Sequence, residues 1–434
     1  MDALLGFSVF LAAMLVLLAT GAPVAVAMGL LGAIGVVLLL PPAAITQLAT
    51  IAFAQSANFV LVVVPLFVLM GEALAATSIG RDLFTAAQIW LRRLPAALAV
   101  GTVFACACFA AVCGSSPVTA ATIGAMAVPE MIKKGYDRRL ALGVTAAGGT
   151  LGILIPPSIP MILYGIITET SIGALFIAGI VPGIMMALML SATAIALALR
   201  NPALAPQAAR GVAERERWTS LAAVIPVMVL AAAVLGSIYT GIATPTEAGA
   251  VGALGALVIA GVMGALGRRA VVRIFDNTAR TTAMFVLLII GGLFSAFVLA
   301  RLGIPQGTAK FLVELQVAPW VILVLINLLL LVLGMFMDPM SLMVIIVPVF
   351  FPAVVALGYD PVWFGVLITI NIEIAMISPP VGFNLFVLKT VIPDVDMKDI
   401  IAGSLIFIVP LIAGIGILIA WPEVALFLPR LMMK

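Results

Sequence analysis

Long apolar runs separated by short polar segments fill almost the whole chain. Most of these runs last about 18 to 25 residues, the length that an α-helix needs to cross roughly 30 Å of hydrocarbon. The pattern predicts membrane spans at about residues 3–19, 23–40, 57–76, 140–168, 172–199, 218–240, 246–266, 281–300, 361–392 and 399–421. The runs at 140–168 and 361–392 each contain a Pro-Pro pair, so we expect broken helices there.

Two other apolar stretches, 95–133 and 319–357, are predicted to be helical hairpins. Each follows a less apolar segment with charges at helical spacing, and we expect these segments, 77–93 and 301–318, to lie along the membrane surface as amphipathic arms. The hairpin turns are short and carry little charge. This favours re-entrant hairpins, whose turns lie inside the membrane, and two full spans per hairpin are the alternative.

The broken helix occurs twice, with the same landmarks at the same spacing. The first copy runs from Gly135-Tyr136-Asp137 to Pro156-Pro157, and the second runs from Gly358-Tyr359-Asp360 to Pro379-Pro380. Proline cannot donate the helical hydrogen bond, so each pair leaves backbone carbonyls unpaired. In a membrane such groups persist only where protein buries them or where they line a cavity. Paired breaks in the two halves of a chain therefore indicate the binding site of a transporter.

The basic residues indicate how the two halves are oriented. If Met1 lies outside, all but four of the 21 Lys and Arg residues fall in inner loops. The loop at 130–139 carries four basic residues and its counterpart at 353–362 carries none, so the repeats are predicted to have inverted topology. We expect a first repeat at 1–200, a cytoplasmic linker at 201–217 and a second repeat at 218–434, with both termini on the outer face.

Composition supports this class of protein and excludes several others. With 65% hydrophobic and 9% charged residues and a mean hydropathy of +1.34, the chain is predicted to be an all-α polytopic membrane protein. It has no His, the commonest metal ligand and general base, and no phosphate-binding G-x-x-x-x-G-K-[ST] loop. We therefore expect no enzyme activity, no cofactor and no nucleic-acid partner, with the lipid bilayer as its surroundings.

The first candidate site combines the first hairpin turn with the first break. Hydroxyl groups at Ser115 and Thr119 are set against the segment 152–158, where the break frees backbone carbonyls. Such a cage of neutral oxygens is the ligand set that a desolvated sodium ion needs. The alternative is that these hydroxyls only help the helices to pack.

The second candidate site carries charge. Asp338 and Ser341 follow the second hairpin turn and face the segment from Asn371 to Asn384, which includes Glu373. An ionised carboxylate is costly at the bilayer centre, so Asp338 is expected to face a cavity or a cation. Glu373 either has a similar role or stabilises the broken helix.

The helix halves that begin after the breaks point their N-termini toward the membrane centre, and those positive ends suit an anionic substrate. The predicted substrate-binding residues are Ser116, Ser158, Asn371 and Asn384. Glu72 and Glu247 lie at or near span ends, where each is either functional or a snorkelling or capping carboxylate.

Several of these motifs resemble the large membrane subunit of tripartite ATP-independent periplasmic (TRAP) transporters, over essentially the whole chain. They are Gly114-Ser115-Ser116 with 120–124, the stretches 147–152 and 155–161, Thr244-Pro245-Thr246-Glu247-Ala248, and Pro379-Pro380-Val381-Gly382. The resemblance implies an elevator-type secondary transporter of the ion-transporter superfamily. It also implies sodium sites formed by Ser115, Thr119, Gly152, Ile155 and Pro157 in one half and by Asp338, Ser341, Ser378 and Pro380 in the other. Thr119 departs from the family pattern, in which some members carry Asn.

The resemblance further implies two partners: a small four-helix membrane subunit, which we expect as a separate chain because none precedes Met1, and a periplasmic substrate-binding protein. The expected function is sodium-coupled import of an organic acid, such as a C4-dicarboxylate, across the bacterial inner membrane. The alternatives are an anion channel, which needs a continuous polar path, and an autonomous carboxylate symporter without a binding protein. A structural scaffold subunit would not need an acidic residue inside the membrane or paired breaks.

Overall fold

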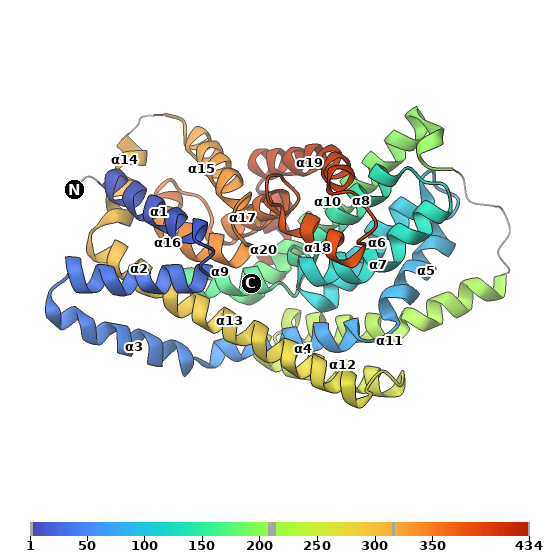
Figure 1. Cartoon of the computed structure of the whole chain (residues 1–434), viewed down its shortest axis with the longest axis horizontal. Coiled ribbons are helices and arrows are strands. Elements are labelled where there is room, and N and C mark those ends of the chain that lie inside the picture. Colours follow the sequence, from blue (N-terminus) through green and yellow to red (C-terminus); the bar gives the residue numbers. More distant parts are fainter. Residues whose placement is uncertain (1–2, 207–213, 315–316, 433–434) are drawn as a thin grey trace.

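The computed structural model describes residues 3–206, 214–314 and 317–432, and this part of the chain is helical without strands (Figure 1). The first half contains α1 (Ala3–Ala19), α2 (Val24–Leu39), η1 (Pro42–Ala44), α3 (Ile45–Ser56), η2 (Phe59–Val62), α4 (Val63–Ala75), α5 (Ile79–Leu91), α6 (Ala97–Cys113), α7 (Ser116–Lys133), α8 (Arg138–Thr150), η3 (Leu151–Ile153), α9 (Ile159–Thr168), α10 (Ile172–Arg200) and η4 (Pro202–Leu204). The second contains α11 (Glu214–Tyr239), α12 (Pro245–Val262), α13 (Arg268–Arg301), α14 (Ile304–Glu314), α15 (Pro319–Gly334), α16 (Pro339–Ala356), α17 (Pro361–Met376), α18 (Phe383–Val391), α19 (Met397–Ala420) and α20 (Glu423–Met432).

The helices form two layers in the view of Figure 1. The lower layer contains α2, α3, α4, α11, α12 and α13, in which α13 packs along α2 and α12 packs along α4. The upper layer contains the hairpins α6–α7 and α15–α16, the broken helices α8–α9 and α17–α18, and the long helices α10 and α19. The fold class expected from the sequence, an all-α polytopic protein with hairpins and broken helices, is confirmed.

The repeated Gly-Tyr-Asp motif has the same structural role in both halves. Gly135 and Gly358 have φ angles of +82° and +85°, which end α7 and α16 in the left-handed conformation that glycine adopts readily. The following Asp then begins the next helix: Asp137 Oδ1 accepts from Arg139 N and Leu140 N, both at 3.0 Å, and Asp360 accepts in the same way at the start of α17. Three residues therefore make each sharp turn from a hairpin into a broken helix.

The two halves interlock at the broken helices. In the first half α9, the segment after the break, packs against α16 of the second hairpin; in the second half α18 packs against α7 of the first hairpin. The long helices exchange in the same way, because α19 packs on α8 and α10 packs on α17. Each hairpin and each break therefore contacts both repeats, and the centre of the upper layer belongs to both halves.

The hairpin turns stop beside the breaks, as expected for re-entrant hairpins. Ile159 N donates to Gly114 O at 3.4 Å, which joins the first turn to the start of α9. From that point α9 continues for 10 residues, or about 15 Å at the α-helical rise, beyond the turn of the hairpin. In the second half, a Cβ atom added to Gly334 would lie 2.5 Å from the Ala375 side chain, so this turn lies beside the end of α17.

The sequence prediction differs from the structure in the scaffold helices. Within the described residues, 6 helices are long and apolar enough to cross a membrane, and a bent pair makes a seventh candidate. That pair consists of residues 42–56 and 59–75, which meet at 49°. The predicted span at 57–76 corresponds to its second part, and the sequence analysis predicts no helix for its first part. The predicted span at 281–300 is the second half of α13, a continuous helix of 34 residues. Polar residues on α3 and at the start of α13 interrupt the apolar pattern. The sequence therefore predicts neither α3 nor the first part of α13.

The helix after the predicted linker also begins earlier than the sequence predicts. It is α11, which begins at Glu214 and not at residue 218. Residues 207–213 of the predicted linker lie outside the described residues. The segment before residue 207 contacts the first half, since Leu204 O accepts from Asp137 N at 2.9 Å.

Candidate functional site

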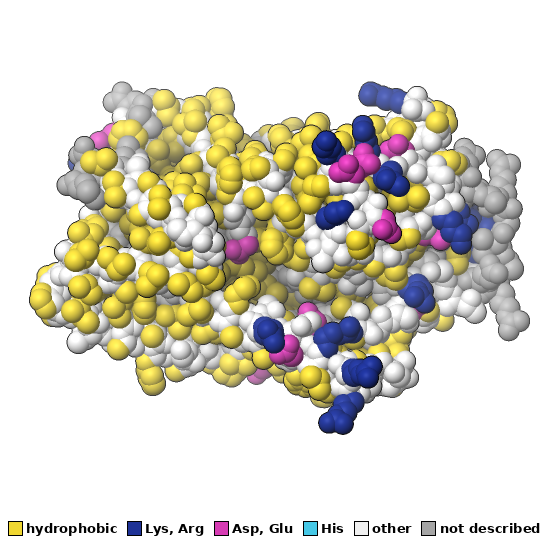
Figure 2. Space-filling model, in the orientation of Figure 1, with side chains coloured by type: hydrophobic (Ala, Val, Ile, Leu, Met, Phe, Trp, Pro, Cys, Tyr) yellow, Lys and Arg dark blue, Asp and Glu magenta, His cyan; other side chains and the backbone are white. Residues whose placement is uncertain are grey.

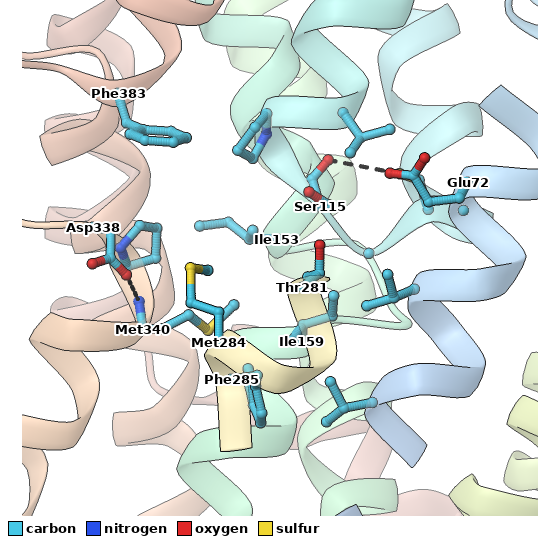
Figure 3. Close-up of a pocket in the computed structure, with 18 residues that line it drawn as sticks. Glu72, Ser115, Ile153, Ile159, Thr281, Met284, Phe285, Asp338, Met340 and Phe383 are labelled. Atoms are coloured by element: carbon cyan, nitrogen blue, oxygen red, sulfur yellow. Dashed lines mark hydrogen bonds between the residues drawn. The ribbon is translucent and has the colours of Figure 1, made fainter. Parts of the chain in front are cut away.

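A cavity of about 390 Å³ lies where the two layers meet at the centre of the molecule. The upper layer contributes both hairpin turns, including Ser115 and Asp338, together with Ile159 and Phe383 from the helix halves after the breaks. The lower layer contributes Glu72 on α4 and a wall of α13 residues (Thr281, Met284 and Phe285). Figure 2 shows a hollow between the layers with an acidic side chain in it, and Figure 3 shows its lining residues. The two candidate sites predicted from the sequence, each formed by a hairpin turn and a break, therefore meet at one cavity.

The first hairpin turn and the first break are in close contact. Thr119 Oγ1 donates to Ser115 O at 2.8 Å. A Cβ atom on Gly152 would lie 2.6 Å from Ser115 O and 2.8 Å from Thr119 Oγ1, and one on Gly114 would lie 2.6 Å from Pro157 O. Four predicted sodium ligands, those at 115, 119, 152 and 157, thus gather within a few ångströms. Glycine at 114 and 152 permits this approach.

Ile155 is the fifth residue predicted for this site. Its backbone N–H donates to Leu151 O at 3.0 Å, and its side chain packs against Gly183 of α10. The structure thus places the Ile155 side chain away from the hairpin turn and toward the neighbouring long helix.

The second hairpin turn centres on Asp338, which begins α16. Its Oδ1 atom accepts from Met340 N at 3.0 Å and from Ser341 N at 3.1 Å, and its Oδ2 atom accepts from Ser341 Oγ. Two of the predicted ligands, Asp338 and Ser341, are therefore paired. Ser378, in the break, instead donates to Ile374 O in the last turn of α17 at 2.6 Å, and Pro380 is exposed.

The four predicted substrate-binding residues are buried and do not line the cavity. Asn384 Nδ2 donates to Ser116 Oγ at 2.7 Å, which joins α18 to the first hairpin across the two repeats. Asn371 Nδ2 donates to Asn327 O at 2.9 Å, and Ser158 Oγ accepts from Met161 N at 3.3 Å as the cap of α9. In this conformation all four side chains connect helices or cap them.

The three remaining acidic candidates have different environments. Glu373 is fully buried in α17, and neither carboxylate oxygen has a hydrogen-bond partner. Glu247 forms a reciprocal capping box with Thr244 at the start of α12, which confirms the capping interpretation. Glu72 lines the central cavity and accepts from Asn277 Nδ2 at 2.8 Å.

Glu72 is the functional candidate that the sequence did not distinguish from a span-end carboxylate. Its position in the sequence, at or near the end of a predicted span, does not show which residues lie opposite the carboxylate. Figure 3 shows the side chains of Glu72 and Ser115 pointing toward each other and meeting at the cavity wall. Because Glu72 belongs to the lower layer and Ser115 to the first hairpin, this pair marks the contact between the two layers.

Comparison with known proteins identifies the family. The family described as "Tripartite ATP-independent periplasmic transporter, DctM component" matches residues 11–424. The chain belongs to this family. It is 36% identical over 406 residues to the C4-dicarboxylate TRAP transporter large permease protein of Pseudomonas aeruginosa, covering 93% of each chain.

Other members of the DctM family with similar sequences have different substrates in their names. The chain is 33% identical to the sialic acid TRAP transporter large permease protein of Vibrio cholerae, covering 86% of this chain and 87% of that one. It is also 33% identical to the ectoine TRAP transporter large permease protein of Halomonas elongata, covering 85% and 86%. Among solved structures, the YdaH transporter of Alcanivorax borkumensis shares the fold, with a TM-score of 0.63 over 88% of this chain and 91% of that chain at 18% identity.

Proposed function

We propose that this DctM-family permease subunit imports a small organic acid by sodium-coupled, elevator-type alternating access. The observation that carries the proposal is the meeting of both hairpin turns and both breaks at one cavity between two layers. The names of the relatives support an organic acid, because C4-dicarboxylates, sialic acid and ectoine all carry a carboxylate. Helix N-termini at the cavity supply a suitable environment for that group.

Sodium coupling is supported by the oxygen atoms at the two turns. The first proposed site contains Ser115, Thr119, Gly152, Ile155 and Pro157, and the second contains Asp338, Ser341, Ser378 and Pro380. Carbonyl, hydroxyl and carboxylate oxygens are the ligands that hard cations prefer. The Ser378 hydroxyl donates to Ile374 O and the described partners of Asp338 are Met340 and Ser341, so completing the second site requires Ser378 to turn toward Asp338.

An elevator movement is supported by the division of the cavity wall between the layers. Glu72 and Thr281 come from the lower layer, whereas Ser115 and Asp338 come from the upper one. A displacement of the upper layer along the lower one would carry both hairpin turns together. An anion channel is disfavoured because the cavity wall is mainly apolar and contains no Lys or Arg among its lining residues.

The partners and the orientation complete the proposal. Membership of a tripartite family supports a small membrane subunit and a periplasmic binding protein that delivers the substrate. The distribution of Lys and Arg supports an inner-membrane protein with both termini on the periplasmic face. A cysteine replacing Arg138 should then be protected from an impermeant thiol reagent added outside, whereas one replacing Asp360 should react.

Reconstitution in liposomes tests the function. The chain, its small membrane partner and the loaded binding protein should together produce uptake that requires an inward sodium gradient. Replacing sodium by potassium should abolish uptake, and omission of either partner should do the same. Flux that continues without a gradient would favour a channel, and robust sodium-driven uptake by the chain alone would favour an autonomous symporter.

A further inference from the structure

Two tryptophans and two arginines lie where the arm α5 packs against α11, outside the lining of the central cavity. Trp90 belongs to the last turn of α5, and Arg92 follows two residues later. The rings of Trp90 and Trp218 meet edge to face, with centroids 6.3 Å apart and planes at 84°. The guanidinium carbon of Arg217 lies 5.8 Å from the centroid of the Trp90 ring, within the range of a cation–π contact. These contacts connect the end of the arm to the start of a long apolar helix.

The cluster lies at the membrane–water interface. Arg217 and Trp218 are the first two residues of the candidate span Arg217–Tyr239, so the apolar stretch begins at the cluster. Tryptophan is enriched at this depth, where its ring lies at the level of the lipid headgroups. The side chains of Trp90 and Trp218 are 44% and 64% exposed, which leaves much of both rings open to lipid.

The two arginines lack protein partners at the atoms that most need them. Both side chains are half-buried. Arg92 Nη1 and Arg217 Nε are buried, and neither has a hydrogen-bond partner in the described part of the chain. A buried donor of a charged group is costly to leave unpaired. By contrast, Arg139, Arg280 and Arg430 are exposed, and each pairs with a carboxylate.

The missing partner should be an anion, and its position identifies the chemistry. Guanidinium donors match the oxygens of a phosphate group, and they remain charged at any physiological pH. At headgroup depth the abundant phosphate is the phosphodiester of a phospholipid. Basic groups between helices at the membrane surface bind anionic headgroups. Since no described ion pair neutralises Arg92 or Arg217, a lipid with a net negative charge is favoured over a zwitterionic one.

We propose that Trp90, Arg92, Arg217 and Trp218 form a binding site for the headgroup of an anionic phospholipid such as phosphatidylglycerol. The arginines bind the phosphodiester, and the exposed tryptophan rings pack beside the glycerol and the upper acyl chains. The helix α5 also packs on α6 of the first hairpin. A lipid bound at this site therefore contacts the arm that connects the first hairpin to the lower layer. The inference is independent of the cargo and of sodium coupling.

Thermal stability of the purified full-length chain in a nonionic detergent tests the proposal. The probes are dioctanoyl phosphatidylglycerol, dioctanoyl phosphatidylcholine and inorganic phosphate. The two lipids have the same acyl chains and differ in net charge, and the inorganic ion supplies phosphate without a lipid. A bound ligand raises the melting temperature. Phosphatidylglycerol should do so at concentrations at least about tenfold lower than phosphatidylcholine, the effect of a charge-assisted contact, and inorganic phosphate should have no effect at the same concentrations.

The double variant Arg92→Gln with Arg217→Gln removes both charges from the site. It should raise the half-saturating concentration of phosphatidylglycerol about ten- to hundred-fold, the effect of lost charge-assisted contacts. Arg268→Gln with Arg269→Gln is the matched control, because it removes the same charge from two exposed arginines at the start of α13. The control should bind phosphatidylglycerol as the unchanged chain does. The melting temperature of each variant without lipid verifies folding.

Three results would overturn the inference. Equal stabilisation by phosphatidylcholine would show that the charge of the lipid is not recognised, and stabilisation by inorganic phosphate at the same concentrations would indicate a site for the free ion. Equal weakening by the control variant would assign the effect to general surface charge. The comparison of probes on the unchanged chain tests the site even if the double variant does not fold. None of these measurements involves transport, so they leave the proposed function untouched.

Discussion

Ser115 and Asp338 occupy equivalent places in the two hairpins. Each begins the second helix of its hairpin, and the same number of residues separates each from the Pro-Pro pair of its half. In the first half the contacts are made by neutral groups, with Ser115 O accepting from Thr119 Oγ1 at 2.8 Å. In the second half a carboxylate occupies the position and caps its own helix.

The two breaks differ correspondingly. Gly152 lies directly against the first hairpin turn, whereas its counterpart in the second half is Ala375, and the glycine that makes room there is Gly334 on the hairpin. The repeat therefore preserves the backbone path and the close approach of turn and break while it changes the chemistry of the contact. One turn is organised by tight packing of neutral oxygens, and the other is organised by a charge.

The largest effect is expected where packing organises the site. Gly152→Ala would place a methyl group 2.6 Å from Ser115 O and 2.8 Å from Thr119 Oγ1, so the turn must move. Overpacking of this kind costs about 1–3 kcal/mol, and a displaced turn no longer presents its oxygens together. We expect sodium-driven uptake to fall roughly 5- to 150-fold, the factor that this energy range corresponds to. Uptake by the reconstituted complex, normalised to folded protein, measures this.

Gly416→Ala is the matched control for Gly152→Ala, because a Cβ atom added at that position in α19 meets nothing within 4 Å. It should retain normal uptake. In the second half, Gly334→Ala should reduce sodium-driven uptake. The double variant Gly334→Ala with Ala375→Gly should restore it, since it moves the methyl group to the other side of the contact. Normal uptake by Gly152→Ala would show that the first turn tolerates displacement and is not organised by packing.

Asp338→Asn tests the charged half and should have an intermediate effect. Asparagine caps helices about as well as aspartate, so α16 should keep its start. A lost charge-assisted contact of about 1.5–3 kcal/mol should raise the half-saturating sodium concentration roughly ten- to hundred-fold. Uptake measured against sodium concentration determines this value.

The control for Asp338→Asn is Asp360→Asn, which removes the charge from an equivalent cap: Asp360 Oδ1 accepts from Val362 N at 2.8 Å and from Trp363 N at 3.1 Å. Its sodium dependence should match that of the unchanged chain. An unaltered half-saturating concentration for Asp338→Asn would exclude direct sodium binding by the carboxylate.

The sequence predicts the features of this comparison that depend on local chemistry. Gly-Tyr-Asp and Pro-Pro specify turns, caps and breaks through neighbouring residues, so both broken helices and both hairpins follow from their spacing. The contacts between Glu72 and the first hairpin region, and between Asn384 and Ser116, join segments that are far apart in the chain. The second contact arises because α18, after the break of the second half, packs on α7 of the first hairpin, and the first arises because α4 packs on α6. Neither packing is encoded by a local pattern in the sequence. The helix α3 has no long apolar run and is stabilised by packing against α13.

The smallest effect is expected at a contact that joins the halves without lining the cavity. Ser116→Ala removes the acceptor of Asn384 Nδ2, a bond of 2.7 Å, and leaves the amide with Ala146 O at 3.4 Å. A buried donor without a good acceptor costs about 1–3 kcal/mol, so the melting temperature of the purified chain should fall. The dependence of uptake on sodium and cargo concentration should stay unchanged, because neither residue lines the cavity.

Ser237→Ala is the control for Ser116→Ala. It removes a hydroxyl that donates to Val234 O within α11, and it should leave the melting temperature nearly unchanged. Weaker cargo binding by Ser116→Ala at an unaltered melting temperature would instead make Ser116 a substrate-binding residue.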